Sequence, residues 1–464
     1  MTATFAPFFK DPTYRETPAP SSAGSNYSWF TSDFKAYVGA SVGSGVVATN
    51  TAGADSSLEA SLVSYAKAKF SADLNSNAVY VAPWGADANA GTFASPYLTL
   101  NKAVRTSIAT YVYLMGFTER NPITPNDYRS SDTPTGKLKI VKGLGAPAVI
   151  GYPGTDLSAA TWTNSSGTYN TVVTAYPGRV LYSGNRDQSG RPIPLLQYGS
   201  SGALTGSVYG WYYDSGTATL YVRLGGNSVT ASAPLLRAVY SNSSTAAAGD
   251  PRFLIYGAAR IAFENVIFDG VYPYLLYNSG SGYLFMENCE ARYSTNYGVF
   301  NSDGYSYLKD VVIHRPKSDG VNYKNPFAPP TGLEWNVTSE FAGDLETFGT
   351  QYGNVNASSN DATTGYIVRV NGLYRWSQGP TAPDTNSWNI GVKFGPSSVG
   401  FDGAAGVAGG DVVAQEVAGK VYCDTCVAQG SRYGYYAYGS GTTIYLRNSV
   451  GNTATDGVGV IAQY

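Results

Sequence analysis

Short apolar segments recur along the second half of the chain, and each is interrupted at one polar position. From residue 260 onward, a few β-branched or aromatic residues are followed by Asn or Asp and then by a second short apolar run. The segments are RIAFENVIFDG, YLFMENCEARY, YSYLKDVVIHR, GLEWNVTSEFA, YIVRVNGLYRW, KVYCDTCVAQG and TIYLRNSVGNT. A repeat of roughly 20 to 50 residues is typical of a solenoid, and strand-rich repeats without helices between them favour a parallel β-helix.

The shared polar position marks the same place in every repeat. It is occupied by Asn265, Asn288, Asp310, Asn336, Asn371, Asp424 and Asn448, at spacings of 23, 22, 26, 35, 53 and 24 residues. The spacing of 53 is about two repeats, so we expect one coil without a marker near GGDVVAQEVAG. Because coils stack at about the 4.8 Å strand spacing, we expect the markers to point inward and to bond to the coils above and below. Cys289 then packs in the core column of Val266, Val311 and Val337.

The region before the repeats carries the helical pattern that the repeats lack. Residues 1 to about 55 are rich in Pro, Ser, Gly and Ala and are expected to form an extended arm. In DSSLEASLVSYAKAKFSADL, Ser56 and Glu59 fit a capping box, and the apolar residues at helical spacing are Leu58, Leu62, Tyr65 and Ala66. In TLNKAVRTSIATYVYLM, Thr99 is the expected N-cap of a second helix, whose apolar face is Leu100, Val104, Ile108 and Tyr111.

Between these helices and the repeats the pattern changes to that of strands. TYNTVVTAYPGRVLYSG and VYGWYYDSGTATLYVRLGG alternate aromatic or β-branched residues with polar ones, and DSG supplies a hairpin turn. We therefore expect four regions: the arm at 1–55, a helical cap and first strand at 56–115, first coils with an inserted β subdomain at 116–250, and coils with long loops at 251–464.

The stretch YVAPWGADANAGTFASPYLTLNKAV resembles the opening motif of the pectate-lyase-like right-handed parallel β-helix superfamily. In that superfamily a strand, a GxDxNxGT…SPxxTLxxA stretch and a capping helix begin the first coil. The insert segment GWYYDSGTATLYVRLGG is similar to inserts of bacterial and bacteriophage members. The resemblance extends over about residues 77–464. It implies an all-β, right-handed parallel β-helix, with the phage members being homotrimers as a rule, but it does not fix an activity because the superfamily holds lyases, hydrolases, epimerases and binders.

The composition favours a neutral partner. Charged residues make up only 13% of the chain, which carries 39 tyrosines, 54 glycines and a net charge of −2. Such a balance excludes the basic footprint of a protein that binds nucleic acid or an anionic membrane, whereas a tyrosine-rich polar surface suits carbohydrate. The first residues do not fit a secretory signal, and no apolar run is long enough for a membrane helix.

Few residues offer nucleophilic or metal chemistry. His314 is the only histidine, which excludes sites built from several histidines and leaves it as a general base or as a surface side chain. Cys423 and Cys426 form a single CxxC, which fits packing, a local disulfide or half of a redox or zinc motif. We expect no metal and no cofactor.

Stacking the repeats places ionisable residues in one outward column. Four positions after the successive markers come Asp269, Arg292, His314, Glu340 and Arg375. Glu334 and Arg369 occupy matching positions before their markers, and a one-residue shift of the apolar phase is expected to turn both outward. The column fits either a solvated ladder of salt bridges or a carbohydrate groove whose carboxylates act as acid and base or nucleophile.

The longest connections, KSDGVNYKNPFAPPTG and EFAGDLETFGTQYGNVNASSNDATTG, leave the same coils and supply further candidates. The candidate catalytic residues are Glu334, Glu340 and Asp319. The candidate substrate-binding residues are Tyr323, Trp335, Asp361, Arg369, Arg375 and Trp376. These loops fit trimer contacts equally well. The resemblance transfers no catalytic motif, because the chain has neither a dense aspartate cluster for calcium nor paired aspartates with a GHG segment.

Three functions fit this sequence. The first is a tailspike- or tail-fibre-like phage virion protein that binds bacterial surface polysaccharide, with depolymerisation as an activity to test. It is expected to be a homotrimer that contacts other tail proteins through its N-terminal arm. The second is a non-catalytic structural or adhesive virion component. The third is a secreted bacterial polysaccharide lyase or glycosidase.

Overall fold

The structure is a computed structural model in which most of the chain after residue 76 is described. The described ranges are 77–105, 109–118, 121–123, 138–151, 155–173, 176–187, 190–225, 228–240, 254–256, 260–270, 274–279, 282–294, 296–302, 304–324, 331–343, 355–360, 366–377, 379–395, 410–414, 419–429 and 433–463. The expected arm and the helix with Ser56 and Glu59 lie outside them. No helix within these ranges is long and apolar enough to cross a membrane.

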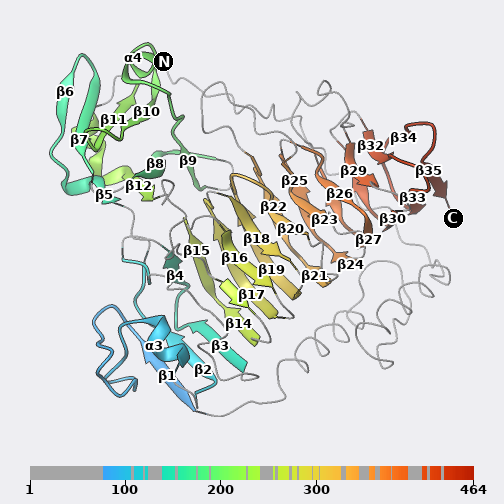
Figure 1. Ribbon diagram of the computed structural model, residues 1–464, viewed down its shortest axis with the longest axis horizontal. Coiled ribbons are helices and arrows are strands. Elements are labelled where there is room, and N and C mark those ends of the chain that lie inside the picture. The colour runs from blue at the N-terminus through green and yellow to red at the C-terminus, as the bar shows by residue number, and fades with distance from the viewer. Residues whose placement is uncertain are drawn as a thin grey trace.

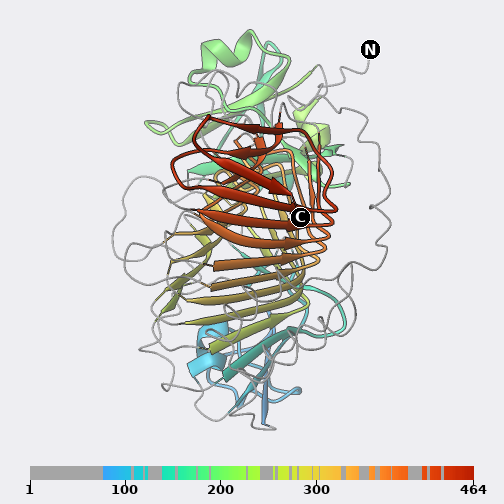
Figure 2. The ribbon, with the colours of Figure 1, turned by 90° about the vertical axis from the view of Figure 1, so that its right-hand side faces the viewer.

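Two parallel sheets wind along the chain as the walls of a β-helix (Figures 1 and 2). The first, of 18 strands, contains β1 (Ala78–Val81), β2 (Tyr111–Leu114), β3 (Leu138–Gly143), β4 (Ala148–Gly151), β14 (Arg260–Glu264), β15 (Val266–Asp269), β17 (Tyr283–Arg292), β19 (Tyr305–His314), β21 (Thr331–Trp335), β22 (Thr338–Glu340), β24 (Tyr366–Val370), β25 (Leu373–Arg375), β27 (Asn386–Ile390), β28 (Lys393–Phe394), β30 (Lys420–Asp424), β31 (Val427–Ala428), β33 (Thr443–Arg447) and β35 (Val460–Gln463).

The second wall has nine strands, the first of which precedes β14 along the chain. It contains β13 (Leu254–Tyr256), β16 (Tyr274–Ser279), β18 (Tyr297–Asn301), β20 (Val321–Tyr323), β23 (Ser358–Asn360), β26 (Ala382–Asp384), β29 (Gly410–Ala414), β32 (Tyr433–Ala437) and β34 (Thr453–Thr455). Figure 2 shows the coils as successive layers. The predicted parallel β-helix is therefore confirmed.

Each marked repeat turns at a residue in the left-handed region of backbone space. At this corner φ lies between 49° and 55° in Asn265, Asn288, Asp310, Asn336, Asn371, Thr425 and Asn448. Asn and Asp adopt this conformation more readily than other side chains, which accounts for most of the markers. The expectation that they point inward is wrong. Asn336 is exposed and donates a hydrogen bond to Asp310 of the preceding coil at 2.9 Å.

From residue 260 onward, two coils turn at this corner on a residue other than Asn or Asp. In KVYCDTCVAQG the corner residue is Thr425, whereas the buried Asp424 pairs with Arg447 at 2.7 Å. The expected coil without an Asn or Asp marker does occur: it turns at Gly391, between β27 and β28, and continues into β29, which lies within GGDVVAQEVAG. Gly391 has a φ of 62°, which glycine adopts without steric cost.

The coil interior is filled by one continuous apolar cluster. Cys289 lies in it together with Val266, Val311 and Val337, as expected. Cys423 and Cys426 also lie in it, on either side of the corner at Thr425. All three cysteines are free thiols, so the structure contains no disulfide within CDTC.

The stretch after β1 covers the first coil. It leads into the helix α3 (Leu100–Arg105), whose Leu100, Ala103 and Val104 join the interior cluster. The Thr99 hydroxyl accepts a hydrogen bond from the amide of Lys102 at 3.2 Å, so the predicted N-cap is confirmed. The helix is shorter than expected, because Tyr111 already belongs to β2.

One carboxylate explains the spacing of the polar residues in the opening motif. Asp87 accepts hydrogen bonds from the backbone amides of Leu98 at 3.1 Å and Thr99 at 2.9 Å, and from the Thr99 hydroxyl at 2.8 Å. Asn89 donates to the carbonyl of Pro96 at 2.8 Å. These bonds fold the small-residue turn back onto the start of the helix, where an open strand edge would otherwise be bare.

The expected β insert is present and rests against the first coils (Figure 1). It contains β5 (Thr155–Asp156), η2 (Leu157–Ala159), β6 (Thr163–Ser165), β7 (Thr168–Val172), β8 (Pro177–Arg186), β9 (Pro192–Pro194), α4 (Ser201–Thr205), β10 (Tyr209–Asp214), β11 (Thr219–Leu224), α5 (Val229–Ser232), η3 (Ala233–Leu235) and β12 (Leu236–Tyr240). Two four-stranded antiparallel sheets, in the orders β10-β11-β7-β6 and β5-β12-β8-β9, enclose a core of their own. The predicted hairpin is β10–β11, with Asp214 opposite Thr219 at its end.

Candidate functional site

The predicted ionisable column is formed in register. Parallel pairing places Asp269 beside Arg292, Arg292 beside His314, His314 beside Glu340, and Glu340 beside Arg375. The neighbouring positions Phe268, Ala291 and Ile313 belong to the interior cluster, so the column faces away from the coil interior. The part of the sequence prediction that concerned alignment is therefore confirmed.

A second corner follows this column directly and is occupied by bulky residues. Tyr293, Arg315, Phe341 and Trp376 have φ values of 56°, 50°, 59° and 57°. The left-handed backbone conformation costs a residue with a Cβ about 1 to 2 kcal/mol. Four such residues in successive coils therefore require favourable packing of their side chains. Phe341 and Trp376 stack at 4.6 Å, Arg315 lies over Phe341 at 4.3 Å, and Arg375 lies over Trp376 at 3.6 Å.

The insert covers this face, which corrects the expectation of a solvated column. Arg237 of β12 pairs with Asp269 at 2.9 Å, and Arg179 of β8 donates to the carbonyl of Arg315 at 2.6 Å. His314 has no solvent-exposed surface, and Glu340 is 2% exposed. His314 is therefore not a surface side chain, although it faces out of the coil.

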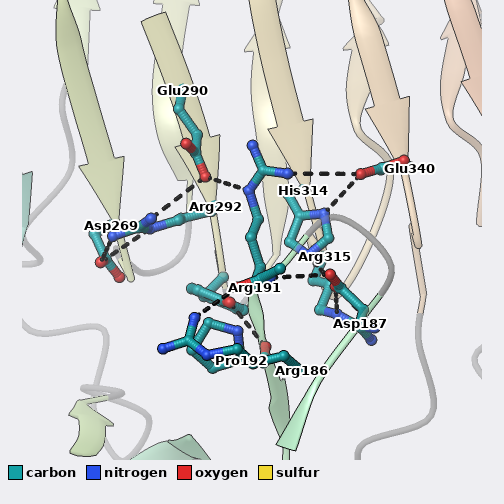
Figure 3. A network of polar contacts seen from close by, with 12 residues as sticks. Arg186, Asp187, Arg191, Pro192, Asp269, Glu290, Arg292, His314, Arg315 and Glu340 are labelled. Carbon is teal, nitrogen blue, oxygen red and sulfur yellow. Dashed lines mark hydrogen bonds and ion pairs between the residues drawn. The ribbon is translucent and has the colours of Figure 1, made fainter. Parts of the chain in front are cut away.

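His314 lies between two carboxylates, one from each part of the fold (Figure 3). Its Nε2 is 2.9 Å from Asp187 Oδ2, at the end of β8, and its Nδ1 is 3.2 Å from Glu340 Oε1. Two carboxylates on one imidazole are satisfied by a ring that donates from both nitrogens, or by a neutral ring beside one protonated carboxyl. In both arrangements His314 and Glu340 share one exchangeable proton.

Asp187 is the carboxylate that stays ionised. Burial raises its pKa, but the hydrogen bond and charge of His314, with the charge of Arg315, outweigh this and lower the pKa to about 2. Arg315 Nη2 lies 3.4 Å from Asp187 Oδ2. Asp187 therefore faces His314 as an anion, and the hydrogen bond between His314 Nδ1 and Glu340 lies on the opposite side of the ring.

Arginines connect Glu340 to a second glutamate (Figure 3). Arg191 of the insert donates from Nε to Glu290 at 2.8 Å, and its Nη1 lies 3.9 Å from Glu340. Arg375 donates from Nε and Nη2 to Glu340 Oε2 at 3.2 and 3.0 Å. Together with Asp187, His314 and Glu340, the residues Arg191, Glu290 and Arg375 form a polar cluster. Solvent reaches Arg191, Glu290 and Arg375, which keep 20%, 18% and 22% of their side-chain surface exposed.

Glu334 and Arg369 are not part of this site, and the prediction that they turn outward is wrong. Both are fully buried in the coil interior, where they continue the column that begins with Met286 and Leu308. Arg369 donates to Asp384 at 2.6 and 3.0 Å, and its Nε lies 3.7 Å from Glu334. They form a buried polar network that substrate cannot contact in this structure.

Glu334 has an unusual environment within that network. It accepts hydrogen bonds from the hydroxyls of Tyr374 at 2.5 Å and Ser358 at 3.1 Å. Burial raises the pKa of Glu334 above its ordinary value, although Arg369, Tyr374 and Ser358 act in the opposite direction. The carboxyl group therefore holds its proton to a higher pH than an exposed glutamate does.

The candidates from the long connections do not gather at the site either. Asp319 is buried and accepts hydrogen bonds from the Asn356 amide at 2.7 Å and the Ser359 hydroxyl at 3.1 Å, which fits a role in holding β23. Tyr323 belongs to β20 and to the interior cluster, and Trp335 is 1% exposed. Asp361 lies outside the described residues. Of the nine candidates, Glu340, Arg375 and Trp376 lie in or beside the cluster.

The sequence prediction missed three members of the cluster: Asp187, Arg191 and Glu290. Glu290 could have been found, because it lies two positions before Arg292 on the same outward phase. Asp187 and Arg191 could not, since their role depends on where the insert docks. Within the described part of the chain, no group of three or more His, Cys, Asp or Glu is placed to hold a metal ion.

Comparison with known proteins supports the fold. No protein-family model matches the chain, and no curated protein matches it significantly. A solved complex of XylC with xylose covers 84% of this chain and 70% of its own, with a TM-score of 0.53 and 11% identity. A glycoside hydrolase covers 84% and 95%, with a TM-score of 0.43 and 10% identity. Pectate lyase Pel9A covers 84% and 79%, with a TM-score of 0.35 and 11% identity. The likeness to XylC is one of fold.

Proposed function

We propose that this protein binds and cleaves a bacterial surface polysaccharide at the junction of the insert and the coils, as a tailspike- or tail-fibre-like component of a phage virion. One observation carries the proposal: the buried trio of Asp187, His314 and Glu340, backed by arginines, beside the partly exposed Glu290. Titratable groups placed against one another in this way are typical of acid–base sites.

The chemistry that fits the cluster is glycosidic cleavage with two glutamates. Glu340 shares an exchangeable proton with His314 and takes the role of general acid. Glu290 is partly exposed and ion-paired with Arg191, and takes the role of base or nucleophile. Asp187 holds the imidazole from its other side, as an orienting carboxylate does in other acid–base sites.

The exposed members of the cluster define where a glycan first makes contact. Arg191, Glu290 and Arg375 offer guanidinium donors and one carboxylate acceptor, which suit hydroxyl groups and acidic substituents of a sugar. The glycan must move between these side chains to reach Glu340, which Arg375 partly covers. The insert thus belongs to the site and is more than an attachment.

The virion part of the proposal rests on resemblance and on the expected layout of the chain. The opening motif resembles that of the superfamily as a whole, and the insert segment resembles inserts of its bacterial and bacteriophage members. In the proposal, residues 1–55 attach the protein to other tail proteins, three copies assemble into a spike, and the polysaccharide of the host surface is the substrate.

Cleavage of capsular polysaccharides and lipopolysaccharide O-chains tests the proposal. New reducing ends report hydrolysis, and unsaturated uronate reports elimination. We expect Glu340→Gln and Glu290→Gln to lower turnover by about 10² to 10⁴. Glu287→Gln is the matched control, because Glu287 is also partly exposed and paired with a cation, Lys309 at 3.2 Å, but lies outside the cluster. Turnover at the wild-type rate in both cluster variants would show that the cluster only anchors the insert.

A further inference from the structure

The outer sheet of the insert, β10-β11-β7-β6, has two unlike faces. One face carries Trp211, Leu220 and Val222, which form the core of the insert. The other face points away from that core, and Figure 1 shows this sheet on the side of the insert remote from the coils. The function proposed above therefore leaves this face unused.

Two tyrosines stack across strands at the centre of this face. Tyr212 of β10 is directly opposite Tyr221 of β11, with ring centroids 5.8 Å apart and an angle of 30° between the rings. Both side chains are partly exposed. A cross-strand pair of this kind presents a continuous aromatic surface at little entropic cost, because each ring has only two side-chain torsions and is held by its neighbour.

Polar residues continue the row in register. Tyr221 is opposite Asn170 of β7, and Asn170 is opposite Thr163 of β6. The row therefore runs aromatic, aromatic, amide and hydroxyl across four strands. The charged residues on the same face, Asp214 and Arg223, carry one negative and one positive charge, so the face is neutral in sum.

We propose that this face is a second carbohydrate-binding site, which takes an uncharged oligosaccharide independently of cleavage at the junction. The apolar face of a pyranose ring stacks on an aromatic ring, and two adjacent rings suit two successive sugars of a chain. Asn170 and Thr163 offer donors and acceptors to the hydroxyl groups of the next sugar. A neutral face complements a neutral ligand, whereas an acidic glycan would find no excess of cations here.

Calorimetric titration of the full chain with uncharged hexasaccharides tests the proposal. The probes are maltohexaose, cellohexaose, mannohexaose and N-acetylchitohexaose, with hexagalacturonate as the acidic comparison. We expect Tyr212→Ala and Tyr221→Ala each to weaken binding by about threefold to tenfold, while Tyr212→Phe keeps the ring and stays within about twofold. Tyr438→Ala is the matched control, because Tyr438 is 43% exposed and stacks on Tyr436 at 6.2 Å, but lies in the last coils.

The result separates this site from the junction. Glu340→Gln should keep the same affinity for the hexasaccharide, and Tyr212→Ala should keep the wild-type turnover of short substrates. Wild-type protein that binds none of the uncharged probes overturns the proposal, as does binding that survives both tyrosine substitutions. Binding of hexagalacturonate alone also overturns it, because the ligand would then be recognised by charge.

Discussion

Replacing Arg369 by methionine should cost more stability than almost any other single change in the coils. Arg369 is fully buried between β21 and β27 and donates to Asp384, Ser358 and Asn389. Methionine fills a similar elongated volume but donates nothing. Asp384, itself fully buried, would lose the guanidinium that holds both of its carboxylate oxygens.

The size of the loss follows from what remains unpaired. Removing one partner of a buried ion pair leaves an uncompensated charge and costs about 3 to 5 kcal/mol. This corresponds to a change of roughly 10² to 10⁴ in the unfolding equilibrium constant. The double variant Arg369→Met/Asp384→Asn removes the charge as well, so we expect it to recover about 1 to 3 kcal/mol relative to the single variant.

Urea unfolding followed by circular dichroism measures both free energies. Arg186→Met is the control, because Arg186 is exposed and its removal should change the free energy by less than about 0.5 kcal/mol. A loss below about 1 kcal/mol in Arg369→Met would refute the reasoning. So would a double variant that is less stable than the single one, since the penalty would then not come from an unpaired Asp384.

Three further predictions concern other parts of the coils. Because the folded-state pKa of Glu334 is raised, its stabilising contribution is fully present below the unfolded pKa of about 4.3 and is lost as pH rises through the folded pKa. Glu334→Gln should therefore gain stability relative to wild type as the pH rises above about 4.3, which urea titrations at several pH values measure. Asn288→Val should cost about 1 to 2 kcal/mol and Asn288→Gly almost nothing, because Asn288 has a φ of 52°; equal thermal shifts in the two would contradict this. Burial raises the pKa of Cys289 to about 12 and that of Cys423 well above its usual value, so iodoacetamide should label no cysteine in the native protein and all three in urea.

The repeats made the columns predictable because parallel strands in register place equivalent residues side by side. This is why Asp269, Arg292 and His314 could be aligned from their distance to the markers alone. The marker itself was misplaced in one coil, where Asp424 is the last residue of β30 and Thr425, directly after it, forms the corner. An aspartate is the better candidate for a left-handed corner on propensity, and the ion pair of Asp424 with Arg447 outweighs that preference.

The orientation of Glu334 could not be derived from alternation. In GLEWNVTSEFA the apolar residues are Leu333 and Trp335, so a period of two assigns them to the interior. In the structure Trp335 faces outward and is nevertheless 1% exposed. Where both faces of a strand are buried, the alternation no longer distinguishes them, and the phase is decided by register with the neighbouring coils.

The candidate site shows a different limit, because it is divided between two parts of the chain. Glu290, His314 and Glu340 lie on successive coils and face outward from the same sheet, so a repeat pattern can align them. Asp187 and Arg191 come from the insert, which follows no repeat, and they acquire their partners only when the insert docks on the coils. The same docking turns a ladder of surface charges into a buried cluster with a shared proton. The chemistry proposed for this protein therefore depends on the packing of the insert as much as on the β-helix that carries the glutamates.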